Sequence, residues 1–356
     1  MLLNKTDPEH PRNENIFFAW ELSKSYGRLN AVKGISFRVK QGECFGLLGV
    51  NGAGKSTTFR MLTGEELPDG GTMYLNEHSL HMERKKYLAE MGYCPQQDAI
   101  LESLNSWDHL HLFARLRGIP NPEVKATVEK WIHKLNLTAY ASQPSGTYSG
   151  GNKRRLNIAM ALIGNPLLVL MDEPTTGVDP AARRSLWNTL KMCQKAGQSV
   201  ILTSHSMEEC EALCNRLVIM IKGRLVCVGA SQELRQRFGA GYNIHVKLNP
   251  GCQRTDVDKI KNRIATTLVC KLTDENKGFV GFHVTDRQAT WTKMYTMMNE
   301  LRADYDCIED FAVLSSTLEQ LFIQFARARG DNGNTGPANG VMKRRWWQKK
   351  TEGSAV

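Results

Sequence analysis

The sequence contains no long hydrophobic run. No apolar stretch approaches the ~18 residues that a membrane-spanning helix needs, and residues 1–8 have neither the charged nor the apolar region of a signal peptide. The nine cysteines are scattered without a C-x-x-C pair, and for Cys210 and Cys214, four positions apart, packing in the core is favoured over metal binding. We therefore expect a chain in a reducing cytosolic compartment that reaches a membrane only through partners.

The composition is that of a folded protein with a basic tail. At 356 residues with 41% hydrophobic content, the chain suits two domains with real cores. The net charge of +10 raises the question of an anionic partner, and five of the positive charges lie in Lys343–Lys350. With Trp346 and Trp347, this segment is either a contact for an anionic lipid surface or a solvated tail.

The most informative stretch fits the pattern G-x-x-x-x-G-K-[ST]. It lies between an apolar, strand-like run over 44–48 and a helix-like run over 57–63, which is the context of a phosphate-binding loop. Its glycines let backbone N–H groups converge on an anion at the positive end of a helix. We predict that these residues bind a nucleoside triphosphate: Gly49, Asn51, Gly52, Ala53, Gly54, Lys55, Ser56 and Thr57.

The rest of the chain reads as alternating strands and helices. The gap from Lys55 to Asp172 is far longer than the ~30 residues of one strand–helix–strand unit, and its helical periodicity predicts a helical subdomain inserted over about 98–165. Beyond it, the alternation predicts a largely parallel sheet with helices on its faces. Strands are expected at 16–20, 34–39, 167–171, 199–203, 216–221 and 224–228, and helices at 181–194 and 207–214.

From Gly241 a different pattern begins. It predicts strands at 242–248, 267–272, 278–284 and 307–314 and helices at 257–266, 289–301 and 317–328, an order that suggests a small ferredoxin-like domain. We expect a flexible segment over 1–15, a nucleotide-binding domain over 16–240, an α+β domain over 241–328 and a flexible basic tail over 329–356.

Several polar residues follow predicted strands. Asp172 and Glu173 end an apolar strand, where a first carboxylate can hold Mg²⁺ and a second can activate water. Acidic residues also end strands as simple caps, but the upstream phosphate loop favours the catalytic reading. His205 follows another strand and precedes a capping-box pattern, Ser206–Glu209, and is either a γ-phosphate contact or an ordinary loop residue. Asp179 before Pro180 reads as a helix N-cap, an interface residue, or both.

A second helix start, in Tyr148–Leu156, carries a serine and two glycines and can also bind an anion. One complete phosphate loop plus one additional anion-binding helix end suggests a composite site, shared between two copies of the fold.

Taken in order, these motifs resemble the nucleotide-binding domain of an ABC transporter over residues 16–236. The resemblance implies a P-loop α/β ATPase with ATP and Mg²⁺ as ligands, Glu173 and His205 as catalytic residues, and Asp179 in the D-loop. It implies Mg²⁺ contacts at Ser56, Gln96 and Asp172, and base stacking on Tyr26, which the sequence places in a loop. The signature that would complete a partner's ATP site is Ser149, Gly150, Gly151 and Asn152, which departs from L-S-G-G-Q at Tyr148 and Asn152.

Those departures, with residues 42–55, 93–96 and 172–180, resemble the A subfamily of eukaryotic ABC transporters, the lipid exporters. This implies a partner nucleotide-binding domain (in the same polypeptide, another chain or a homodimer), transmembrane domains outside this chain, and a place at the cytoplasmic face of a membrane. It also implies that the segment after Gly241 is a regulatory domain. The alternatives are an ATPase subunit of a bacterial-type drug or polysaccharide exporter and, disfavoured because the chain has a single such domain, a soluble ABC-type ATPase acting on nucleic acid.

Overall fold

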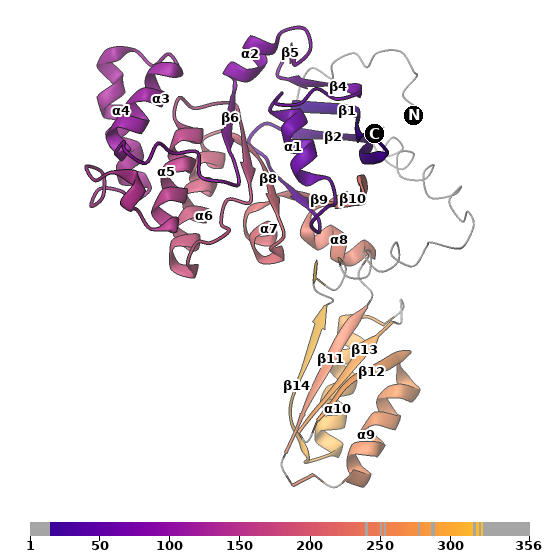
Figure 1. The fold of residues 1–356 in the computed structure, drawn as a ribbon. Coiled ribbons are helices and arrows are strands. Elements are labelled where there is room, and N and C mark those ends of the chain that lie inside the picture. Colours follow the sequence, from indigo (N-terminus) through magenta and orange to yellow (C-terminus); the bar gives the residue numbers. More distant parts are fainter. Residues whose placement is uncertain are drawn as a thin grey trace, which may run out of the picture. The chain divides into compact units, whose positions relative to one another are not determined.

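A computed structural model describes residues 15–238, 241–249, 251–252, 254–276, 278–285, 289–315, 318–319 and 322. The described residues form two compact units, one up to Ala230 and one from Ser231 (Figure 1). This division falls earlier in the chain than the predicted boundary between residues 240 and 241. The predicted flexible segment over 1–15, apart from Asn15, lies outside the described residues, as do the basic tail and most of the helix expected over 317–328.

The first unit is built on a mainly parallel sheet, as predicted. The strands run in the order β10-β9-β3-β8-β7-β6, and within the described sheet only β10 and β9 pair antiparallel. Every residue of β3, β7 and β8 is buried, which explains the apolar runs over 44–48, 168–171 and 200–202 within them. The strands are β3 (Cys44–Leu48), β6 (Met91–Cys94), β7 (Leu168–Asp172), β8 (Ser199–Ser204), β9 (Arg216–Ile221) and β10 (Arg224–Gly229).

A second, antiparallel sheet was not predicted. It contains β1 (Asn15–Tyr26), β2 (Leu29–Lys40), β4 (Gly70–Leu75) and β5 (His78–Ser79) in the order β2-β1-β4-β5. Gly27, at a φ of 57°, makes the tight turn that pairs Tyr26 with Leu29. Tyr26 is therefore the last residue of a strand, and the prediction that it lies in a loop was wrong.

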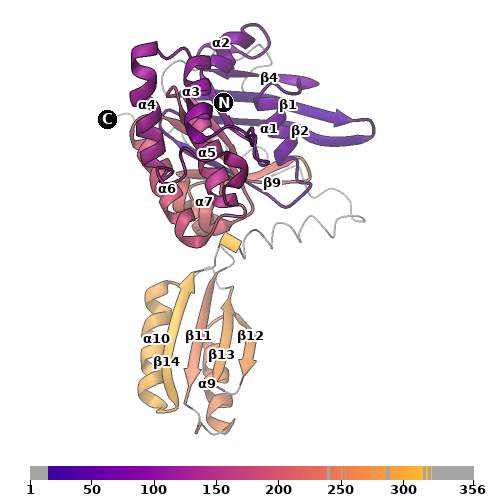
Figure 2. The same cartoon turned by 60° about the vertical axis from the view of Figure 1, so that its left-hand side comes forward.

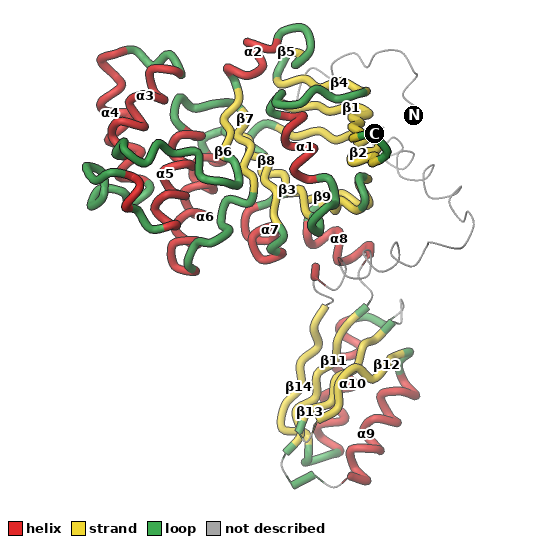
Figure 3. Tube along the Cα trace, in the orientation of Figure 1, coloured by secondary structure: helices red, strands yellow, loops and turns green. Residues whose placement is uncertain are grey.

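The helices of the first unit fall into two groups, one in the predicted helical subdomain and one beside the two sheets. In the segment predicted as a helical subdomain lie α3 (Ser106–Leu116), α4 (Asn121–Lys134), a 3-10 turn (Ser145–Thr147) and α5 (Gly150–Leu162). Of these, α3 contacts both α4 and α5, and α5 contacts β6 (Figure 3). The helices that accompany the two sheets are α1 (Lys55–Leu62), α2 (Arg84–Ala89), α6 (Pro180–Lys195) and α7 (Met207–Leu213).

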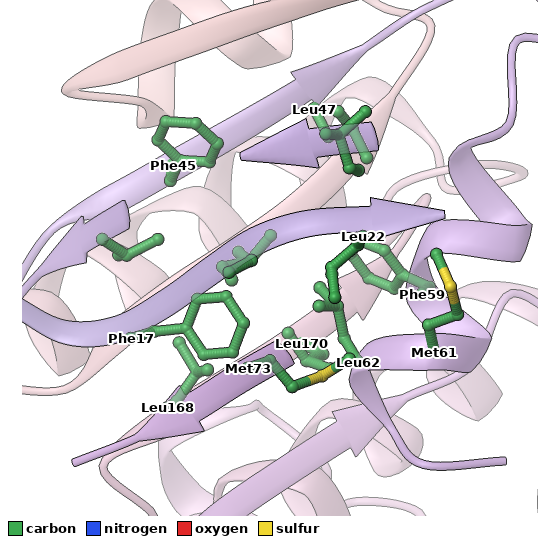
Figure 4. Packing of buried hydrophobic residues seen from close by; sticks show 14 of the residues in the cluster. Phe17, Leu22, Phe45, Leu47, Phe59, Met61, Leu62, Met73, Leu168 and Leu170 are labelled. Carbon is green, nitrogen blue, oxygen red and sulfur yellow. The ribbon is translucent and has the colours of Figure 1, made fainter. Parts of the chain in front are cut away.

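One hydrophobic core joins the two sheets and fixes α1. Phe17 and Leu22 of β1 belong to the same buried cluster as Phe45 of β3, Phe59 of α1 and Leu170 of β7 (Figure 4). Burying side chains of this size contributes about 1.5–3 kcal/mol each. The position of α1, and of the loop that precedes it, is thus set by the core and not by local contacts alone.

The second unit has a β-α-β-β-α-β order after an initial helix. Its sheet runs β12-β13-β11-β14 with antiparallel neighbours, and residues of α9 and α10 belong to one core with the sheet (Figure 2). The elements are α8 (Ser231–Phe238), β11 (Tyr242–Leu248), α9 (Arg254–Thr267), β12 (Cys270–Asn276), β13 (Phe279–Val284), α10 (Trp291–Asp304) and β14 (Ile308–Ser315).

The strand predicted over 267–272 begins too early. Thr267 is the last residue of α9, and its hydroxyl donates to the carbonyl of Arg263 at 2.8 Å. This bond back along the helix satisfies the threonine inside helical structure, so β propensity does not decide its conformation. The strand itself begins at Cys270.

Candidate nucleotide-binding site

The parallel strands bring the predicted motifs to one edge of the sheet. Leu48, at the end of β3, pairs with Ser204 at the end of β8, and Asp172, at the end of β7, pairs with Thr203 of β8. Cys94, at the end of β6, pairs with Met171 of β7. Because these are the carboxyl ends, the phosphate loop, the Asp172–Glu173 pair, Gln96 and His205 follow neighbouring strands at the same edge.

The loop from Gly49 to Gly54 needs glycine for two reasons. Gly54 has a φ of 107°, and a Cβ there would lie 2.7 Å from the carbonyl oxygen of Ala31. A Cβ on Gly49 would meet the carbonyl oxygen of Met220 at the same distance. The loop is thus held tightly against its surroundings at these two positions, while Asn51, Gly52 and Ser56 are exposed.

Lys55 is the first residue of α1, and its side chain reaches back to this loop. Its ammonium donates to the carbonyl oxygens of Gly49 at 2.7 Å and Val50 at 3.3 Å, and its side chain is buried. Burial lowers the pKa of Lys55, and the carboxylates of Glu173 and Asp172 oppose that shift. The structure therefore places the ammonium of Lys55, the predicted phosphate-binding cation, against the loop and in the field of Glu173, a predicted catalytic residue, and Asp172, a predicted Mg²⁺ ligand.

Asp172 is held at the end of β7. It is buried, and the hydroxyl of Thr203 donates to its Oδ1. Burial raises the pKa of Asp172, and the nearby Glu173 carboxylate adds to that rise while Lys55 lowers it. Burial thus favours the neutral form of this carboxyl, and the positive charge of Lys55 favours its ionised form.

Glu173 is held by contacts from several segments. Its φ of 48° is unusual for a residue other than glycine, and its N–H donates to Thr203 Oγ1 at 3.0 Å. Its Oε2 accepts hydrogen bonds from Gln96 Nε2 at 3.1 Å and Thr176 Oγ1 at 3.2 Å. On the other side, His205 Nδ1 lies 3.4 Å from Glu173 Oε1. The structure thus brings Gln96, Glu173 and His205 into direct contact.

Tyr26 lies on the strand side of the phosphate loop and is 41% exposed. Its hydroxyl donates to Glu66 in the segment after α1, and that hydrogen bond is the largest cause of the raised pKa of Tyr26. Thr57 also lies close enough to affect this pKa. The ring is accessible beside the loop, and its stacking on a nucleobase stays a prediction.

The signature residues are not part of the contact among Gln96, Glu173 and His205. Ser149 is the N-cap of α5, and its hydroxyl accepts a hydrogen bond from the Asn152 N–H at 3.4 Å. Ser149 and Gly150 are exposed, so this helix start is open to another molecule. Asp179 caps α6, accepting from the Ala182 N–H at 2.9 Å, which confirms the N-cap reading.

The capping box predicted at Ser206–Glu209 is only half formed. Ser206 caps α7 and accepts from the Glu209 N–H at 3.3 Å. The carboxylate of Glu209 does not return to the N-cap backbone, because it accepts a hydrogen bond from Ser204 Oγ at 2.7 Å.

Sequence reasoning missed Arg154, which connects the signature helix α5 to the segment of Gln96 and to the segment of Asp172 and Glu173. Its buried guanidinium, from α5, donates to carbonyl oxygens on both sides of the site. The acceptors are Pro95, Gln96 at 3.2 Å, Asp172 at 2.6 Å, Glu173 at 2.9 Å and Pro174 at 2.9 Å. No local signal separates Arg154 from its neighbour Arg155, since only the packed position of α5 gives the first residue five acceptors.

Comparison with known proteins agrees with this geometry. The family model described as "ABC transporter" matches residues 32–176. The chain is 44% identical over 333 residues to human "ATP-binding cassette sub-family A member 2", and these residues are 93% of this chain but 14% of that protein. It is 42% identical over 320 residues to human "Phospholipid-transporting ATPase ABCA3", covering 89% of this chain and 19% of that protein.

A solved "ATP binding subunit of ABC transporter" aligns with a TM-score of 0.59 and 28% identity, over 63% of this chain and 93% of that one. The chain is an ABC transporter nucleotide-binding domain. Its relatives are A-subfamily members, of whose length this nucleotide-binding domain spans less than a fifth. Within its described residues, no helix is long and apolar enough to cross a bilayer.

Proposed function

We propose that this nucleotide-binding domain binds ATP with Mg²⁺ and hydrolyses it to drive transport of lipids by a longer membrane protein. The observation that carries the proposal is the held carboxylate of Glu173, in contact with Gln96 and His205 at the edge that also carries Lys55. The names of relatives such as the phospholipid-transporting ATPase ABCA3 support the lipid assignment.

The chemistry follows from the residues at the edge. The N–H groups of the phosphate loop and the ammonium of Lys55 would bind the β- and γ-phosphates. Glu173 would accept a proton from the attacking water. As it does so, the water oxygen would bond to the γ-phosphorus and the bond from that phosphorus to the leaving ADP oxygen would break. His205, beside Glu173, would hold the γ-phosphate side of the site, and Tyr26 would stack on the base.

The donor set fits Mg²⁺, which prefers oxygen ligands. Ser56 offers an exposed hydroxyl, and Asp172 offers a carboxylate. The amide nitrogen of Gln96 donates to Glu173, which leaves its carbonyl oxygen as the cation-binding end. When bound, the ion would neutralise charge on the phosphates.

The open helix start at Ser149 supports a shared site. Its N–H groups and hydroxyl, with Gly150, Gly151 and Asn152, would contact the ATP held by a second nucleotide-binding domain, and Asp179 would lie at that interface. We place the domain at the cytoplasmic face of a membrane, joined to transmembrane domains outside this chain. The β-α-β-β-α-β unit after Gly241 would be a ferredoxin-like regulatory domain, and the tail over 343–350 a contact for anionic lipid.

The runner-up functions differ in partners and not in chemistry. A subunit of a bacterial-type drug or polysaccharide exporter would use the same residues, but the A-subfamily relatives favour the lipid exporter. A soluble ABC-type ATPase is favoured by no observation in the structure.

The test is Glu173→Gln, which replaces one carboxylate oxygen with an amide of the same shape. We expect it to bind ATP with nearly unchanged affinity, because Glu173 is not in the phosphate loop, while steady-state phosphate release falls by at least about a hundredfold for a lost general base. Phosphate release and fluorescent-nucleotide binding would be measured on the full chain. Unchanged turnover would refute the role of Glu173.

A further inference from the structure

The turn that carries His205 is closed by a small network of hydrogen bonds. Ser204 Oγ donates to Glu209 Oε2 at 2.7 Å and accepts from the Ser206 N–H at 2.9 Å. Ser206 Oγ in turn accepts from the Glu209 N–H at 3.3 Å. The residues on both sides of His205 are therefore tied to one buried residue, Ser204 to the carboxylate of Glu209 and Ser206 to its N–H, and Glu209 is 1% exposed.

The same carboxyl faces α6, the helix that begins at the D-loop. Burial raises the pKa of Glu209, while the Ser204 and Thr175 hydroxyls, the Trp187 indole and the Arg183 charge lower it, so all four groups lie nearby. Thr175 is in the segment after Glu173, and Arg183 and Trp187 are on α6. Figure 1 shows α6 and α7 side by side, as their contacts require.

This junction contains most of the unpaired buried polar atoms in the described part of the chain. Glu209 Oε1, Trp187 Nε1 and Arg183 Nε have no hydrogen-bond partner among the described residues, and the remaining such atom is Glu90 Oε2. A buried carboxylate with one satisfied oxygen costs stability. Packing alone does not account for a glutamate here, because an apolar side chain would fill the same space without that cost.

We propose that Glu209 is a positioning residue that aims His205 at Glu173 and links the His205 turn to the D-loop helix α6. Its satisfied oxygen fixes the Ser204–Ser206 turn, and its other oxygen is unpaired in a carboxyl that lies near Trp187 and Arg183 of α6. A shift of α6 relative to α7 that pairs these groups would be transmitted to His205 through Ser204. This inference rests on the proposed function, since it assigns Glu209 a role in the same hydrolysis.

The experiment is a double-mutant cycle on ATP hydrolysis with the full chain. Glu209→Ala should lower kcat by about tenfold or more while KM for ATP changes less than threefold, because the phosphate loop is untouched and only the aim of His205 is lost. Glu209→Gln keeps an oxygen that accepts from Ser204 and should retain kcat within about threefold. Glu208→Ala, an exposed neighbour with the same charge change, should behave as wild type.

The decisive arm is the His205→Ala background. If Glu209 acts through His205, Glu209→Ala has no further effect on kcat there. Multiplicative losses in the double variant, or a wild-type kcat in folded Glu209→Ala, would overturn the inference. Failure of the proposed function is distinguishable, since wild type would then hydrolyse no ATP or His205→Ala would not slow it. Circular dichroism on each variant, with Glu209→Gln as the less disruptive change, keeps folding separate from rate.

Discussion

Replacing the buried Arg154 with methionine should destabilise the first unit far more than the same change at its half-buried neighbour Arg155. The guanidinium donates to five carbonyl oxygens from two segments, 95–96 and 172–174, and Arg154 is 3% exposed. Hydrogen bonds from a charged donor contribute about 1.5–3 kcal/mol each when taken singly. They are not additive, and a buried carbonyl left without a donor costs about 1–3 kcal/mol.

We therefore expect Arg154→Met to lose about 4 kcal/mol of unfolding free energy and to lower Tm by roughly 8–16 °C for a unit of this size. Urea and thermal unfolding followed by circular dichroism would measure both. Arg155→Met is the matched control, because Arg155 is half-buried and its guanidinium donates to Asn152 Oδ1 at 3.2 Å. The control should lose less than about 1 kcal/mol.

Arg154→Lys separates geometry from charge. Lysine keeps the charge but not the planar fork that reaches several acceptors at once, so we expect it to recover less than half of the loss. Arg154→Met with a stability within about 1 kcal/mol of wild type would refute the reasoning, since five buried carbonyls would then not depend on the guanidinium.

Two further predictions concern pH and nucleotide affinity. Burial raises the pKa of the Cys94 thiol to about 11, so as pH rises above ~8.5 the unfolded thiol ionises first and stability is lost until the folded thiol ionises. Between pH 8 and pH 11, wild type should lose about 3 kcal/mol more than Cys94→Ala in urea unfolding, and equal losses would contradict this. Lys55→Ala removes the ammonium inside the phosphate loop and should raise the Kd for ATP at least about tenfold in fluorescent-nucleotide binding; an unchanged Kd would count against the loop assignment.

Much of the site could be predicted because its parts are local motifs on a regular frame. Each of Gly49–Thr57, Gln96, Glu173 and His205 follows an apolar strand, and carboxyl ends of parallel strands share an edge. Hydrophobic patterning predicted the strands before the phosphate loop, Glu173 and His205, whereas Gln96 was implied only by the resemblance to the family. The contacts of Glu173 with Gln96 and His205 then needed only the register of β6, β7 and β8.

What could not be predicted depends on packing between distant segments. In the antiparallel sheet β1 pairs with β4, some fifty residues away, and residues of both strands share one core with α1. Arg154 and Glu209 look like ordinary charged helix residues in the sequence, and only burial among partners from other elements distinguishes them from Arg155 and Glu208. Thr267 has a strand-forming side chain but ends a helix, because its hydroxyl finds an acceptor there.

We propose that each ATP is held by Lys55 of one domain and covered by Ser149 of another. The most direct measurement mixes two variants of the full chain, Lys55→Ala and Ser149→Arg, and follows phosphate release. Each alone should be inactive, while the mixture should regain activity, because the intact loop of the Ser149→Arg chain meets the intact helix start of the Lys55→Ala chain. A mixture as inactive as its components, under conditions where wild type hydrolyses ATP, would contradict a shared site.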